Sequence, residues 1–285
     1  MYKVTFNMAS GFTQTTQSLK SGKQQTNSLR LDTATTNISA YASVIVLGIF
    51  DSGGNLVRKL VQKADSVSNF GVIVDSLASG TYTVVAAAGQ KDMVFDYDNQ
   101  INATYAVYYS VVHDVTSYTA NLPWQDTFLD RFTLTVSNGP VNQTVPLTRK
   151  VGKLEVDFND VIPASASRLD IEINKEDFDY YPQTGQLGGA DTLTYHLTIP
   201  AAAKGTNTYK VSELVLNTAT PFSVIITGYD SSNHVIATHT ITNVTCTANQ
   251  RTILTGNFSN QGQGGGSGFN MALDPVWSAP NTIHF

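Results

Sequence analysis

Two short clusters of carboxylates and aromatic rings are the residues of this chain best suited to binding a ligand. They occupy positions 92–99 and 176–182. A sugar ring stacks its C–H face on a tyrosine ring while carboxylates accept hydrogen bonds from its hydroxyls. The alternative is a pair of solvated loops anchored by aromatics, which is the commoner role of such segments. The candidate glycan contacts are Asp96, Tyr97, Asp98, Asp177, Asp179, Tyr180 and Tyr181.

The sequence shows no set of residues with the types and spacing of a known catalytic site. A nucleophilic enzyme needs a Ser or Cys beside a His and an orienting acid, and no Gly-x-Ser-x-Gly or similar signature occurs. His113 and Asp114 are adjacent, but neighbouring strand residues point to opposite faces. A glycosidase would need two carboxylates at a defined separation in a deep cleft, which two small sandwiches rarely supply. We therefore predict no catalytic residues and no enzyme.

Metal and cofactor chemistry is also disfavoured. The five histidines are dispersed, and the single cysteine rules out both a cysteine cluster and an intramolecular disulfide. Residues 96–99 begin like a calcium loop, but Ile101 takes the place of the required Gly and Val107 that of the required Glu. An irregular calcium site is left as a minor alternative. We predict no metal, no cofactor, and a buried Cys246 that acts as a small hydrophobe.

The composition is that of an exported strand-and-turn protein. Only 14 % of the 285 residues are charged, against about 25 % in an average soluble protein. The net charge is −5 and the acidic residues are scattered along the chain, so no basic surface is expected that would attract nucleic acid. No apolar run approaches the ~20 residues of a membrane helix, and no signal sequence stands at Met1. We expect a mature form whose leader has been removed.

Alternation of apolar and polar residues with a period of two is the dominant pattern, and it predicts half-buried β-strands. Segment 44–50 is apolar throughout, as expected of a central strand covered on both faces. No window of a dozen residues carries a helical stripe. The sequence therefore predicts an all-β protein of β-sandwich type. The clearest alternating segments are 132–136, 154–158, 169–173, 193–199 and 222–226.

The chain length and the turn pattern indicate two domains in tandem. A length of 285 residues exceeds the usual size of one core. An internal echo, Phe50-Asp51-Ser52 against Tyr229-Asp230-Ser231, predicts a similar hairpin in each half. We place an N-terminal β-sandwich at 1–148 and a C-terminal β-sandwich at 149–285.

The C-terminal region contains a candidate assembly strand. Segment 261–268 has the composition of a flexible tether, and the apolar residues after it alternate like a strand that needs a sheet edge. Such a strand can complete the sheet of another subunit by strand addition. The alternative is an ordinary last strand that pairs with its own domain. The residues of the candidate assembly strand are Phe269, Met271, Leu273, Val276 and Trp277.

Three segments carry a resemblance to a known family: the strand and hairpin at 45–57, the segment 77–86, and Arg149-Lys150-Val151-Gly152-Lys153-Leu154. With them the chain resembles the fimbrillin superfamily of Bacteroidales-type fimbriae, specifically its minor-subunit and anchor (FimB-like) branch. The likeness spans nearly the whole chain. None of these segments is a catalytic signature.

The resemblance implies two transthyretin-like Greek-key sandwiches and export as a lipoprotein to the outer membrane or cell surface. It implies a fimbrial anchor or accessory subunit whose partners are other fimbrial subunits, in contact through strands. The alternative function is a surface polysaccharide-binding module, with carbohydrate as partner. No lipid-bearing Cys lies near Met1, so membrane attachment would depend on an N-terminal lipid anchor in the removed leader. Arg30 is a candidate for the basic processing site of the superfamily's stalk subunits.

Overall fold

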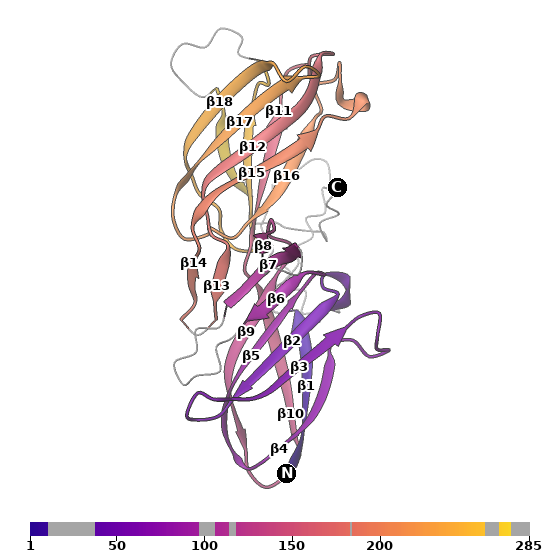
Figure 1. The fold of residues 1–285 in the computed structure, drawn as a ribbon, viewed down its shortest axis with the longest axis vertical. Coiled ribbons are helices and arrows are strands. Elements are labelled where there is room, and N and C mark those ends of the chain that lie inside the picture. Colours follow the sequence, from indigo (N-terminus) through magenta and orange to yellow (C-terminus); the bar gives the residue numbers. More distant parts are fainter. Residues whose placement is uncertain (11–37, 97–105, 114–117, 183, 260–267, 275–285) are drawn as a thin grey trace, which may run out of the picture. The chain divides into compact units, whose positions relative to one another are not determined.

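The computed structural model describes residues 1–10, 38–96, 106–113, 118–182, 184–259 and 268–274, and β-strands dominate them (Figure 1). The predicted all-β class is confirmed. Within this part of the chain the helical segments are the 3₁₀ turns η1 (Ile38–Ala40) and η2 (Ala201–Ala203), and neither is long or apolar enough to cross a membrane. The described residues divide into two units. Unit 1 contains 1–150 and 179–188, and unit 2 contains 151–178 and 189–274.

Unit 1 is a sandwich of two sheets that share one strand. The β1 sheet has the order β4 (Val72–Leu77), β1 (Tyr2–Ser10), β10 (Val141–Arg149). The β2 sheet has the order β3 (Leu56–Lys63), β2 (Val44–Phe50), β5 (Gly80–Gly89), β9 (Phe128–Val136). β10 runs parallel to β1 from Val141 to Leu147 and then pairs with β9 at Thr148 and Arg149. A strand that changes sheets in this way closes one corner of a sandwich.

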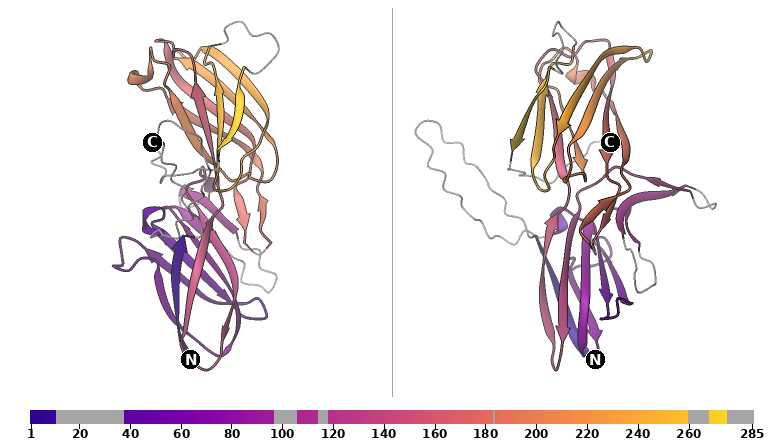
Figure 2. Two further views of the ribbon diagram at one scale, coloured as in Figure 1. Left: turned by 180° about the vertical axis from the view of Figure 1, so that it is seen from behind. Right: turned by 90° about the vertical axis from the view of Figure 1, so that its left-hand side faces the viewer.

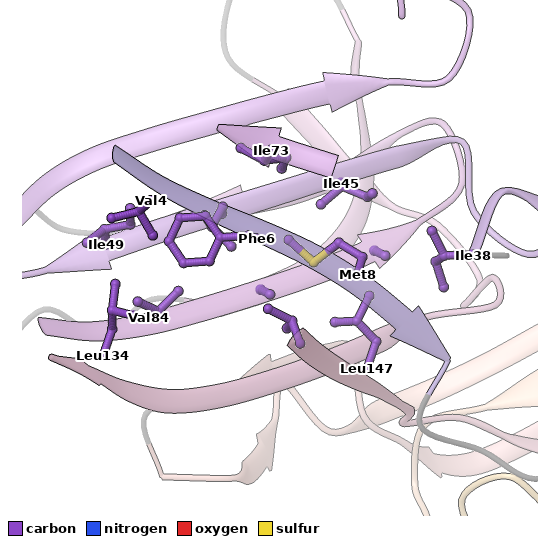
Figure 3. Packing of buried hydrophobic residues seen from close by; sticks show 14 of the residues in the cluster. Val4, Phe6, Met8, Ile38, Ile45, Ile49, Ile73, Val84, Leu134 and Leu147 are labelled. Atoms are coloured by element: carbon purple, nitrogen blue, oxygen red, sulfur yellow. The ribbon is translucent and has the colours of Figure 1, made fainter. Parts of the chain in front are cut away.

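The core of unit 1 lies between these two sheets. β1 contributes Val4, Phe6 and Met8, which point inward at every second position as a half-buried strand requires (Figure 3). They meet Ile49 of β2 and Leu134 of β9, among others. These side chains are at most 9 % exposed, so hydrophobic burial is the main stabilising contribution here.

A third, smaller sheet covers the outer face of the β2 sheet. It has the order β14 (Gln186–Gly188), β13 (Asp179–Tyr181), β7 (Ala106–His113), β6 (Met93–Asp96), and β8 (Tyr118–Asn121) also pairs with β7. The ring of Phe95 in this β7 sheet lies on Gly48 of β2, where a Cβ would lie 2.9 Å from it. Val46 and Phe50 on the same face are therefore buried. The expectation that segment 44–50 is covered on both sides is confirmed.

Unit 2 is a second sandwich with two sheets of four strands. The β11 sheet has the order β16 (Lys210–Val215), β11 (Gly152–Phe158), β19 (Arg251–Gly256), β20 (Asn270–Asp274). The β12 sheet has the order β15 (Asp191–Thr198), β12 (Ala166–Glu176), β17 (Phe222–Asp230), β18 (Val235–Val244). Leu154, Val156 and Phe158 face the core as predicted. Glu155 faces outward yet is only 8 % exposed, because Arg251 and Lys210 lie against it.

The two units share one strand topology, which confirms two Greek-key sandwiches in tandem. Strands β1, β2, β3, β4, β5, β9 and β10 of unit 1 occupy the same places in their sheets as β11, β12, β15, β16, β17, β18 and β19 of unit 2. In each unit the first strand runs parallel to the last strand of this set. The predicted limits 1–148 and 149–285 of independently folding domains stay a prediction.

The sequence echo around Asp51 and Asp230 does not result from this shared topology. Asp51 Oδ1 accepts hydrogen bonds from the backbone N–H groups of Gly53 and Asn55, both at 2.9 Å. Asp230 Oδ1 accepts them from the second and fourth residues after it in the same way. The first turn joins β2 to β3, whereas the second joins β17 to β18, and these hairpins are not equivalent. The echo therefore reflects a turn type that occurs twice, in which an Asp side chain accepts hydrogen bonds from the backbone of the turn.

Candidate functional site

The candidate assembly strand forms β20, the edge strand of the β11 sheet, where it pairs antiparallel with β19 of its own unit (Figure 2, yellow). Met271 and Leu273 lie within β20, and Phe269 lies immediately before it. Val276, Trp277 and positions 261–267 of the tether lie outside the described residues. In this structure the strand completes its own domain, which is the alternative that the sequence left open.

Phe269 anchors the start of β20. Its ring lies over Gly256 at the end of β19, where a Cβ would come within 2.5 Å of the ring carbon Cγ. The ring also meets Phe158 and His239 edge-on, with centroid distances of 6.1 and 5.2 Å. An aromatic ring that fills the space left by a cross-strand glycine fixes the register of an edge strand.

An ion pair anchors the other end of β20. Arg251 Nη2 lies 2.5 Å from Asp274 Oδ2, and Nη1 of the same guanidinium lies 3.2 Å from Glu155 Oε2. The charges therefore form a row across three neighbouring strands on the outer face of the sheet. Because Arg251 and Asp274 are direct cross-strand partners, their attraction selects the same register as Phe269.

Two apolar side chains of β20 are left in solvent. Met271 is 49 % exposed and Leu273 54 % exposed. Their cross-strand partners are Leu254 and Thr252, which are buried. Because direct partners lie on one face of a sheet, Met271 and Leu273 extend the core-facing side of the β11 sheet beyond the covered core.

The hydrogen bonds of β19 show which backbone groups of β20 point outward. The carbonyls of Gln250 and Gly256 accept hydrogen bonds from Lys153 and Asn159, on the β11 side. Backbone groups alternate along a strand, so residues 251, 253 and 255 direct theirs to β20. Their partners 270, 272 and 274 direct theirs back to β19. Met271 and Leu273 therefore direct their N–H and C=O groups to the outer edge.

Parts of the two aromatic–acidic clusters lie in one sheet, although the clusters are far apart in the sequence. Phe95 of β6 and Tyr180 of β13 both pair with Val107 of the central strand β7. The backbone of Asp96 pairs with Ala106, while Tyr97 and Asp98 lie outside the described residues. The structure thus brings together those parts of the two clusters that it describes.

The hairpin of β13 and β14 packs its rings against itself and against Lys150. The Nζ atom of Lys150 lies 5.5 Å from the centroid of the Tyr180 ring, and burial raises the pKa of this half-buried tyrosine. The ring of Tyr181 lies on Gly188, and its hydroxyl donates to Asp179 Oδ2 at 3.4 Å. Burial also raises the pKa of Asp179. Part of the segment for which the sequence left a solvated loop as the alternative is therefore a short pair of antiparallel strands.

One candidate glycan contact belongs to the other unit. Asp177 precedes the hairpin, in the segment assigned to unit 2, whereas Asp179, Tyr180 and Tyr181 belong to unit 1. The second cluster is therefore divided between the two units, and only its later part lies in the β7 sheet.

Sequence reasoning missed a group of buried ionisable residues in unit 2. Glu176 at the end of β12 is fully buried, and Glu213 of β16 is 8 % exposed. Burial raises the pKa of Glu176 to about 8 and that of Glu213 to about 7. Cys246 is buried as predicted, and burial raises its pKa to about 12. No group of three metal-binding side chains occurs among the residues that the structure describes.

Unit 1 contains a buried ion pair that the sequence did not indicate. Arg149 Nε lies 2.6 Å from Asp126 Oδ1, and Nη2 of the same guanidinium donates to Oδ2 at 2.9 Å. The guanidinium also lies against the rings of Tyr41 and Phe128, 5.5 and 5.0 Å from their centroids. Because Arg149 ends β10, this pair holds the corner at which that strand changes sheets.

Solved structures share the fold over nearly the whole chain. The fimbrial anchor protein Mfa2 from Porphyromonas gingivalis matches with a TM-score of 0.55 at 12 % identity, covering 98 % of this chain and 99 % of that one. A candidate polysaccharide-binding protein from Bacteroides thetaiotaomicron matches with a TM-score of 0.59 at 9 % identity, covering 97 % of both chains. A candidate adhesin from the same organism matches with a TM-score of 0.58 at 10 % identity, covering 98 % and 97 %.

At the level of sequence, no curated protein matches the chain. The family model of the fimbrillin-A associated anchor proteins Mfa1 and Mfa2 matches residues 20–274. The resemblance to the anchor branch of the fimbrillins is thereby confirmed, and the chain belongs to the family of fimbrillin-A associated anchor proteins Mfa1 and Mfa2.

Proposed function

We propose that this cell-surface protein, a fimbrial anchor or accessory subunit, contacts other fimbrial subunits by strand addition, with β20 as the exchangeable strand. One observation carries the proposal: β20 is an edge strand of five residues, attached to β19 on one side only within the described part of the chain. Beside its backbone pairing with β19, its side-chain anchors include the Phe269 ring over Gly256 and the ion pair between Asp274 and Arg251.

Exchange is physically reasonable because β20 follows a Gly-rich tether. When β20 leaves, the edge of β19 has unpaired N–H and C=O groups at residues 251, 253 and 255, which is a template for an incoming strand. The vacated space over Gly256 would accept an aromatic side chain of that strand. The released β20 could in turn complete a partner subunit.

A tail deletion tests the proposal. We expect removal of residues 268–285 to abolish incorporation into fimbriae while the protein is still exported at normal levels. Gly139→Ala is a matched control, because this turn glycine has no atom within 4 Å of a Cβ and lies in unit 1. Fimbriae that contain the shortened chain in normal amounts would rule out β20 as the assembly strand.

We further propose that the protein is attached to the outer membrane by a lipid on an N-terminal cysteine of its precursor, and that it performs no catalysis. Membership of an anchor family supports this attachment. Metabolic labelling of the full-length precursor with a fatty-acid analogue tests it. A precursor that carries no label would contradict the lipid anchor, and turnover of a glycan or peptide would contradict the absence of catalysis.

A second candidate function is the binding of surface polysaccharide at the β7 sheet. The observation that favours it is that β6, from the first aromatic–acidic cluster, and β13, from the second, both pair with β7. Asp179 and Tyr181 are the contacts that the hairpin offers. We expect Tyr181→Ala to remove binding on a glycan array, with Tyr229→Ala of β17 as the matched control. Wild-type protein that binds no glycan across a broad array would count against this function.

A further inference from the structure

We infer that the outer edge of β20 pairs with the same strand of a second copy of this chain and forms a symmetric antiparallel dimer. The inference concerns β20 in its place on β19, and it does not depend on strand exchange. Natural proteins protect sheet edges with charges, prolines, bulges or covering segments. Within the described residues, β20 has no strand on its outer side, no proline and no bulge. Its one charge, Asp274, is paired with Arg251.

The sequence of β20 is complementary to itself in an antiparallel register. A two-fold axis at Ala272 places Met271 opposite Leu273 of the second copy, and Leu273 opposite its Met271. The two half-exposed apolar side chains therefore meet on one face, in two identical contacts. On the other face, Asn270 lies opposite Asp274 of the second copy, so an amide donor meets a carboxylate and like charges do not face each other.

The backbone of β20 fits the same register. Met271 and Leu273 direct their N–H and C=O groups outward, as the hydrogen bonds of β19 require. In the proposed register each Met271 faces a Leu273, so each pair exchanges both backbone hydrogen bonds. Ala272 then meets its symmetry mate in the close, non-hydrogen-bonded type of pair, where a methyl side chain is easily accommodated. The dimer would join two four-stranded β11 sheets into one continuous sheet.

Proline substitutions in β20 can distinguish the hydrogen bonds of its outer edge from those that it makes to β19. Leu273→Pro removes an N–H from the outer edge alone, and it removes two hydrogen bonds per dimer. We expect this variant to weaken dimerisation about 30-fold in sedimentation equilibrium, at about 1 kcal/mol per bond. Hydrogen exchange at β19 should be unchanged in the variant. A proline at position 272 would instead remove a bond to β19, so it is not a test of the dimer.

A pair of serine variants controls for the loss of apolar surface. Leu273→Ser should weaken the dimer, whereas Val235→Ser, at an exposed position of edge strand β18, should not. If wild-type protein is monomeric at every soluble concentration, or if Leu273→Pro and Leu273→Ser dimerise like wild type, the inference is wrong.

Disulfide trapping tests the register directly. In the proposed dimer the two Ala272 Cα atoms lie about 4.5 Å apart, within the range of a disulfide. Ala272→Cys should therefore form a covalent dimer on mild oxidation, and buried Cys246 should not interfere. Asn270→Cys is the control, since residue 270 faces residue 274 of the second copy. The two residues 270 are therefore offset by four positions and lie about 14 Å apart. A dimer without an Ala272→Cys cross-link would use another register or another surface, which would overturn this inference and leave the proposed function intact.

Discussion

Replacing Glu176 by Gln should change how the stability of unit 2 depends on pH. Glu176 ends β12 and is fully buried. Its Oε1 accepts a hydrogen bond from the backbone N–H of Leu216 at 2.6 Å, while Oε2 is buried without a hydrogen-bond partner among the described groups. A glutamine can keep the bond from Leu216 through its own Oε1, so the substitution removes the titration and retains the main contact.

The sign and size of the effect follow from the raised pKa. Burial raises the pKa of Glu176 from 4.5 to about 8. Between these values the folded state holds a proton that the unfolded state has released, so the free energy of unfolding falls as the pH rises. At about 1.4 kcal/mol per pKa unit the loss is about 3 kcal/mol at pH 7 and about 4 kcal/mol at pH 8, where the folded state begins to titrate. Glu213, with its pKa raised to about 7, adds to the loss in the same direction.

The assay is urea unfolding of the full chain from pH 5 to pH 8, with peptide-resolved hydrogen exchange to follow unit 2. We expect wild-type unit 2 to lose stability across this range, and Glu176→Gln to lose about half as much because Glu213 still titrates. Glu172→Gln, on the outer face of the same strand, is the control and should behave like wild type. If wild type and Glu176→Gln show the same slope, Glu176 is not protonated in the folded protein.

Three further predictions concern particular contacts. Gly256→Ala should displace the Phe269 ring, destabilise β20 by about 1–3 kcal/mol and raise hydrogen exchange at residues 270–274. Arg149→Met should destabilise unit 1 by about 3–5 kcal/mol in thermal denaturation, whereas the double variant with Asp126→Leu should recover most of this loss, because it leaves no unpaired buried charge. A fragment of residues 1–150 keeps Arg149 but lacks β13, so its β7 should exchange faster than in the full chain, and a synthetic peptide of residues 177–190 should restore the protection.

Much of the fold could be predicted from the sequence because the pattern of burial is local. Leu154, Val156 and Phe158 alternate with polar residues, and they face the core of unit 2 as that alternation requires. The turn at Asp51 was recognisable because its side chain bonds to the backbone two and four residues ahead. Both features depend on residues that are close in sequence.

The candidate sites were less predictable because they depend on pairings between distant segments. Nothing near Tyr180 indicates that it pairs with Val107 of another half of the chain. For the same reason the sequence grouped Glu176 with a solvated cluster, whereas the structure buries it beside the backbone of Leu216. Met271 and Leu273 are exposed although they alternate like the residues of a half-buried strand. The alternation predicts which face of the sheet they lie on, but it does not predict whether another part of the chain covers that face.

The most direct measurement of the central proposal is a photo-crosslink from β20 in living cells. A photoreactive amino acid at Leu273, which is 54 % exposed, can be activated on cells that carry assembled fimbriae. Strand addition predicts a covalent adduct between this chain and a different fimbrial subunit, and no such adduct from the same group at Val235 of β18. An anchor that enters fimbriae normally but gives no adduct with another subunit from position 273 would contradict the proposal.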